Sequence, residues 1–225
     1  MDSRNSPNEM DVARHEIVLR ARQMIADGLG IGSAGNLSVR VGDVVAITPS
    51  AVKYDDLLAR DVSLVSLDGE PVLPDSNPSS ETPMHLAVYR SSLARAVVHT
   101  HSPAVIAHST VFDELPAIHY AIAALGGPVR VAPYIRFGGD ALAQLAVQAL
   151  EGRSAAILQN HGAITYGNSL TDAYERAQLL EWLADLYARA VALGTPRLLS
   201  PSDLADVTAE VRRRHYSSLT PVTEN

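Results

Sequence analysis

Residues 96–108 read AVVHTHSPAVIAH, a short apolar run that ends on His99 and His101. In a β-strand, side chains two residues apart point to the same face, so a strand over this run projects both imidazoles together from its end. Ser102 and Pro103 then have the residue types that cap and begin a helix. Two converging imidazoles suggest a metal, although two ligands do not establish one.

The segments around this strand show hairpin and helix patterns. Alternating apolar residues around Gly42-Asp43 and around Asp68-Gly69 predict two hairpins, and apolar residues at helical spacing predict helices over about 11–27 and 170–192. The other expected elements are helices capped by Ser80 and Ser102, helices over 139–150 and 201–214, and strands over 129–134 and 154–160. Hairpins mixed with helices indicate an α/β fold with antiparallel strands. We expect a single domain over 1–225, with loose tails at about 1–9 and 217–225.

Composition narrows the classes of function. The 225 residues are 47% hydrophobic and carry a formal net charge of −7, which fits a globular protein and argues against nucleic acid as a partner. Because the sequence has no cysteine, any metal must be bound by histidine or by carboxylate. The N-terminal residues lack an apolar leader, and no apolar run reaches the ~18 residues of a membrane span. We therefore expect a cytoplasmic protein without a membrane partner.

His161 is a third candidate metal ligand. It follows the apolar run of ILQNHGAI and precedes a glycine, so it also lies at the end of an expected strand. Three histidines with an open fourth position match a catalytic zinc site. The interval between His99 and His161 is not itself diagnostic. The other histidines considered, interpreted as surface or hydrogen-bonded core residues, are His15, His85, His108 and His215.

Three loops carry small and hydroxyl residues. Their sequences are GSAGNLS at 32–38, TPSA at 48–51 and NPSSETPMH at 77–85. Taken singly, each fits an ordinary turn or a helix cap. In combination, their backbone N–H groups, hydroxyls and Asn36 are suited to binding a phosphate without a fixed positive charge.

These segments, in this order, resemble the class II aldolase/adducin-head family. The resemblance rests on GSAGNLSVR, ITPSAVKY, SSETPMH, VVHTHS and LQNHG, and the segment from LPAIHY to RFGG specifically resembles the L-fuculose-1-phosphate aldolase branch. It covers about residues 10–216. It implies a three-layer α/β/α sandwich around a central, largely antiparallel sheet. It also implies one zinc ion per subunit and a homotetramer with active sites between subunits.

The resemblance assigns roles to individual residues. His99, His101 and His161 match the zinc ligands, and Glu81 matches a carboxylate that binds the metal and also acts as acid and base. Tyr120 matches a tyrosine that gives a proton to the aldehyde oxygen. Tyr216 matches a C-terminal tyrosine that reaches a neighbouring subunit's site. The matching phosphate-binding positions are Asn36, Ser50, Ala51, Ser79 and Ser80, with the backbone of Ser33 a weaker candidate and Phe137 a site-lining aromatic.

One residue departs from the family pattern. Relatives usually have glycine after TPS or TPT, whereas this chain has Ala51. We expect its methyl group to shift the phosphate loop or to require an unusual backbone angle.

The implied reaction is the reversible cleavage of a ketose 1-phosphate to dihydroxyacetone phosphate and a small aldehyde. A lysine Schiff base is disfavoured, because the only lysine is Lys53 in a polar loop. Two enzymatic alternatives from the same family are a pentulose-phosphate 4-epimerase and a methylthioribulose-1-phosphate dehydratase. Such relatives carry an acidic residue within the segment AIHYAIAALGG, which has none here. The non-enzymatic alternative is an adducin-head-like interaction module, which lacks the zinc histidines. The sequence does not identify the aldehyde.

Overall fold

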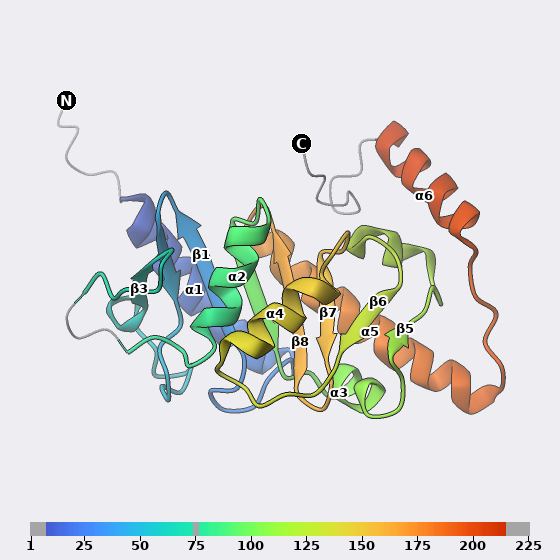
Figure 1. Ribbon diagram of the computed structural model, residues 1–225, viewed down its shortest axis with the longest axis horizontal. Coiled ribbons are helices and arrows are strands. Elements are labelled where there is room, and N and C mark those ends of the chain that lie inside the picture. Colours follow the sequence, from blue (N-terminus) through green and yellow to red (C-terminus); the bar gives the residue numbers. More distant parts are fainter. Residues whose placement is uncertain (1–7, 74–76, 215–225) are drawn as a thin grey trace.

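The computed structural model describes residues 8–73 and 77–214, whose centre is an eight-stranded sheet (Figure 1). The strand order is β3-β2-β1-β4-β8-β7-β6-β5, and every neighbouring pair is antiparallel except β6 and β7. The strands are β1 (Asn36–Val41), β2 (Val44–Ile47), β3 (Ser63–Ser66), β4 (Ala96–Thr100), β5 (Glu114–Leu115), β6 (Val129–Ala132), β7 (Ala155–Leu158) and β8 (Gly162–Gly167). The sheet is therefore mixed but largely antiparallel.

Helices cover both faces of this sheet. They are α1 (Glu9–Ala26), α2 (Thr82–Ser91), α3 (Pro103–Ser109), α4 (Asp140–Ala149), α5 (Leu170–Leu193) and α6 (Pro201–Arg214), with short 3₁₀ helices η1 (Ala59–Asp61) and η2 (Tyr120–Leu125). On β4, Val97 packs with the apolar residues of α2 and α4, while Ala96 and Val98 pack with those of α1 and α5. This alternation confirms the predicted three-layer α/β/α sandwich. None of the helices in the described ranges is both long and apolar enough to cross a membrane.

The first predicted hairpin is confirmed and the second forms only in part. Strands β1 and β2 pair across the Gly42-Asp43 turn, with Val41 opposite Val44. After Asp68-Gly69 the chain also turns back, but its return makes only an isolated bridge between Val65 and Pro71. Proline cannot donate to a ladder, which explains why no second strand develops there.

The N-terminus of α2 differs from the expected one in a way that matters for function. Glu81, rather than Ser80, occupies the N-cap position, and its N–H donates to Ser79 Oγ over 3.3 Å. Pro83 lies in the first turn, as expected. The carboxylate of Glu81 consequently lies at the helix end that favours negative charge.

Candidate active site

Four side chains converge where the end of β4 meets the start of β8, two central strands of the sheet. Glu81 Oε2 lies 3.0 Å from His99 Nε2, and Glu81 Oε1 lies 3.2 Å from His161 Nε2. The Nε2 atoms of His99 and His101 are 2.9 Å apart. One ligand atom from each of the four residues lies within 4.8 Å of all the others, so together they form a candidate metal centre.

Strand pairing brings the distant histidines together. His99 is near the end of β4, and His161 occupies the short connection from β7 to β8. Because β8 is the antiparallel neighbour of β4, with Thr100 opposite Ala163, the start of β8 meets the end of β4. A Cβ atom on Gly162 would lie 2.0 Å from the Thr100 carbonyl oxygen, so this close approach requires glycine.

The orientation of the His99 ring leaves one nitrogen free for the cluster. His99 is completely buried, and its Nδ1 lies 2.8 Å from the carbonyl oxygen of Ala163. A carbonyl oxygen can only accept, so Nδ1 is the donor, as is common for histidines that bind metals. The lone pair of Nε2 can then point toward Glu81 and His101.

The electrostatics of the cluster favour a cation. Burial raises the pKa of Glu81, but the nearby His99, together with the facing groups of His161 and Asn36, outweighs it, and the net pKa is well below the usual range. Burial, reinforced by His99 and His161, lowers the pKa of His101 to about 3, so its ring is neutral. Glu81 Oε1 is buried and accepts no hydrogen bond from the described residues. A carboxylate among three imidazole nitrogens is the kind of donor set that a divalent metal needs.

The spacing of these atoms fits zinc. Zn–N bonds of ~2.0–2.1 Å in a tetrahedron place the ligand atoms ~3.4 Å apart. The separations of 2.9, 3.0 and 3.2 Å lie close to that value. Small rotations of the imidazoles would complete the coordination.

Two predicted phosphate-binding loops lie side by side next to Glu81. An isolated bridge joins Pro49 to Pro78. Ser50 donates its N–H to Asn77 O over 2.9 Å and its hydroxyl to Pro78 O over 2.9 Å. Both of its donors therefore hold the loops together instead of facing an open site.

Ala51 and Ser80 have hydrogen-bond donors that remain available to a ligand. No described residue accepts a hydrogen bond from the N–H of Ala51 or from the N–H and hydroxyl of Ser80. Ala51 has φ = 61°, which confirms the unusual backbone angle expected where relatives have glycine. The phosphate roles of Ser50, Ala51, Ser79 and Ser80 remain predictions.

The predicted aromatic residues lie outside the cluster. Tyr120 begins η2 and is 50% exposed, and no hydrogen bond or ring contact joins it to the three histidines in the described parts of the chain. Phe137 is exposed, in the loop where Gly138 approaches the Ser80 carbonyl. Ser33 is exposed as well. Tyr216 lies outside the described residues.

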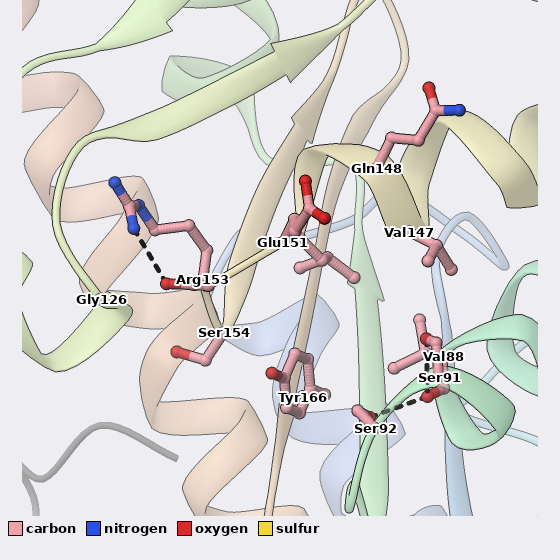
Figure 2. A pocket seen from close by; sticks show the side chains of 12 residues that line it. Val88, Ser91, Ser92, Gly126, Val147, Gln148, Glu151, Arg153, Ser154 and Tyr166 are labelled. Carbon is pink, nitrogen blue, oxygen red and sulfur yellow. Dashed lines mark hydrogen bonds between the residues drawn. The ribbon is translucent and has the colours of Figure 1, made fainter. Parts of the chain in front are cut away.

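A cavity of about 500 Å³ lies at the other end of β8 (Figure 2). Its lining includes Tyr166 near the end of β8 and Ser91 and Ser92 at the end of α2. Glu81 precedes the first residue of α2 and His161 precedes the first residue of β8. Of the predicted site residues that the structure describes, none lines this cavity, so it is separate from the candidate metal centre.

His85 is a hydrogen-bonded core residue, as its interpretation from the sequence allowed, but its link to Glu81 was not predicted. This residue is completely buried and contacts Asn36, whose own side chain donates to Glu81 Oε2 over 3.0 Å. A recognisable signal is present: Glu81, His85 and Tyr89 recur every fourth residue, which places three polar groups on one face of α2.

Comparison with known proteins agrees with this geometry. Residues 15–188 match the family model described as class II aldolase and adducin N-terminal domain. A 5-deoxy-D-ribulose 1-phosphate aldolase from Bacillus thuringiensis is 39% identical, over 86% of this chain and 92% of the relative. A 5-methylthioribulose-1-phosphate/5-deoxyribulose-1-phosphate aldolase from Rhodospirillum rubrum is 37% identical, over 89% and 91%. A solved structure of an L-fuculose 1-phosphate aldolase superposes with a TM-score of 0.87 at 29% identity, covering 94% of this chain and 100% of that one. On these grounds, the chain belongs to the class II aldolase and adducin N-terminal domain family.

Proposed function

We propose that this protein is a metal-dependent aldolase that reversibly cleaves a ketose 1-phosphate into dihydroxyacetone phosphate and a small aldehyde. The observation that carries the proposal is the convergence of Glu81, His99, His101 and His161 beside two donor-bearing loops. The names of the relatives supply the substrate class, since all three act on ketose 1-phosphates. The four clustered side chains also argue against a purely structural adducin-like role.

The proposed metal is zinc, one ion per subunit, held by the three histidines with Glu81 as a further ligand. When bound, it supplies Lewis-acid chemistry by withdrawing charge from the ketose oxygens. The nitrogen-rich donor set and its spacing support this choice.

The chain's own residues would handle the phosphate and the protons. We assign phosphate binding to the backbone N–H groups of Ala51 and Ser80, and the proposal is supported by the fact that no described residue accepts a hydrogen bond from them. In cleavage, the 4-hydroxyl gives its proton to Tyr120, which passes its own phenolic proton on to solvent. The bond between carbons 3 and 4 breaks, the aldehyde leaves, and the electron pair of the bond moves into the enediolate of dihydroxyacetone phosphate. The Glu81 carboxylate takes up a proton from solvent and delivers it to carbon 3, so no net proton is gained or lost.

The assembly is part of the proposal. Tyr120 is half-exposed and, among the described residues, has no contact with the three histidines of the candidate metal centre. A homotetramer with active sites between subunits would allow Tyr120 and Tyr216 to reach a neighbour's metal centre. We place this activity in the cytoplasm.

The proposal is tested by incubating the zinc-loaded protein with dihydroxyacetone phosphate and either acetaldehyde, methylthioacetaldehyde or lactaldehyde. These give a 5-deoxypentulose, a methylthiopentulose and a 6-deoxyhexulose 1-phosphate, respectively. Such aldehydes differ by small groups worth only ~1–3 kcal/mol in a pocket, so we expect reaction with more than one and a ranking by kcat/KM.

The products distinguish the alternatives. An epimerase would invert carbon 4 of a pentulose phosphate and release little aldehyde. A dehydratase would remove water and yield no dihydroxyacetone phosphate. Formation of either set of products, without carbon–carbon bond formation in the aldehyde assay, would overturn the aldolase proposal.

A further inference from the structure

A buried chain of hydrogen bonds leads from the sheet–helix interface to Glu81. Tyr89 Oη lies 2.7 Å from Ser38 Oγ, which lies 2.7 Å from His85 Nδ1. His85 Nε2 lies 2.6 Å from Asn36 Oδ1, and Asn36 Nδ2 donates to Glu81 Oε2 over 3.0 Å. All five side chains are buried.

Two matching periodicities build this chain. Glu81, His85 and Tyr89 lie four residues apart on α2, where four residues advance ~6 Å along the helix axis. Asn36 and Ser38 lie two residues apart on β1, where two residues advance ~6.8 Å. The two sets of side chains therefore interleave along the interface between α2 and β1.

The chain of hydrogen bonds has one direction. The anionic carboxylate of Glu81 can only accept, so the Asn36 amide must turn Nδ2 toward Glu81 and Oδ1 toward His85. Oδ1 can only accept in turn, so the proton is on Nε2 of His85. Burial, with an added effect of His99, lowers the pKa of His85 to about 3, and Nδ1 of the neutral ring accepts from Ser38.

We infer that His85 is a positioning residue, which acts through Asn36 to fix the Glu81 carboxylate at the metal centre. The inference rests on the proposed role of Glu81 in the active site. Without the Nε2 donor, the Asn36 amide is free to rotate. It could then turn its oxygen toward Glu81, and the two like acceptors would push the carboxylate away from the histidines.

Two substitutions at position 85 separate positioning from packing. A glutamine amide can occupy the place of Nε2, so His85→Gln keeps a donor for Asn36. The shorter His85→Asn places its amide near Nδ1 and loses that donor. Both substitutions remove the imidazole ring. If His85 served only to fill space in the core, the two variants would therefore have similar zinc affinities.

The readouts are zinc affinity of the metal-free protein, from competition with a chromophoric chelator, and deuterium exchange at the reacting carbon of dihydroxyacetone phosphate. We expect His85→Asn to bind zinc ~10–100-fold more weakly than wild type, as is typical when an outer partner of a metal ligand is lost. Exchange should slow at saturating zinc. His85→Gln should stay within about threefold of wild type in zinc affinity.

Equal zinc affinity of the two folded variants would overturn the inference, whether or not the protein is an aldolase. Conversely, if the two variants differ in zinc affinity as expected but the protein forms no aldol product, the positioning role stands and the proposed function is refuted.

A second pair of variants serves if His85→Asn does not fold. Ser38→Ala, which removes the donor to Nδ1, is then compared with Tyr89→Phe, which leaves that donor in place. Weaker zinc binding in Ser38→Ala alone supports the inference, and equal binding in both refutes it.

Discussion

Replacement of Gly162 by alanine should weaken metal binding by shifting the backbone that carries His161. The added Cβ would lie 2.0 Å from Thr100 O and 3.1 Å from Thr100 C, whereas real contacts essentially never fall below 3.0 Å. Relieving the clash requires the start of β8 to move ~1 Å away from β4. Neighbouring strands are normally only ~4.7–4.9 Å apart, so a shift of this size weakens their pairing. Because His161 directly precedes Gly162, this movement also displaces a candidate ligand.

The magnitude follows from what the shift disrupts. Weakening two ladder hydrogen bonds at ~1 kcal/mol each, together with ~1–3 kcal/mol for overpacking, gives ~3–5 kcal/mol lost from the free energy of unfolding. Urea unfolding of the metal-free protein measures this loss, and a zinc titration measures the accompanying loss of affinity.

Gly139→Ala is the matched control. A Cβ there meets nothing within 4 Å, so the expected cost is below ~1 kcal/mol, mainly from a poorer helix N-cap. A Gly162→Ala protein with wild-type stability and wild-type zinc affinity would refute the strand-pairing explanation of the site.

Four substitutions test the proposed roles. Glu81→Gln should lower turnover by ~100-fold or more while dihydroxyacetone phosphate still binds, measured by kinetics and calorimetry; near-normal turnover would contradict its role as base. Ser80→Ala should raise KM for the ketose phosphate ~10-fold or more, since a hydrogen bond to a charged group is worth ~1.5–3 kcal/mol, and an unchanged KM would remove Ser80 from the phosphate site. Ala51→Gly relieves the ~1–2 kcal/mol cost of a left-handed alanine, partly offset by chain entropy, so Tm should stay level or rise; a clear fall would contradict the strain. Tyr120→Phe should slow cleavage ~100-fold but spare proton exchange on dihydroxyacetone phosphate, and NMR showing both lost in step would refute its role as the aldehyde-side acid.

Local patterns identified the parts of the site that lie within one element. The strand that carries His99, with His101 directly after its last residue, is predictable because period-two geometry depends only on neighbouring residues. The constraint at Ala51 is also local, since the backbone angle of a tight loop limits its side chain.

Long-range pairing explains what the sequence could not show. The strand β8 was not predicted, because GAITYG is short and weakly patterned between two glycines. Without β8 beside β4, nothing relates His161 to His99. The contact of His85 with Asn36 likewise depends on α2 packing against β1, so its polar neighbours are visible only in the folded chain.

The central claim is that this chain cleaves ketose phosphates with a bound metal. The most direct test compares the rate of cleavage in three preparations of the protein that differ in metal content. Release of dihydroxyacetone phosphate from 5-deoxyribulose 1-phosphate is followed for the protein as purified, after chelation, and after addition of zinc, with metal content determined by elemental analysis. We predict one metal per chain, loss of activity with the metal, and recovery with zinc. An undiminished rate in protein shown to be free of metal would contradict the account.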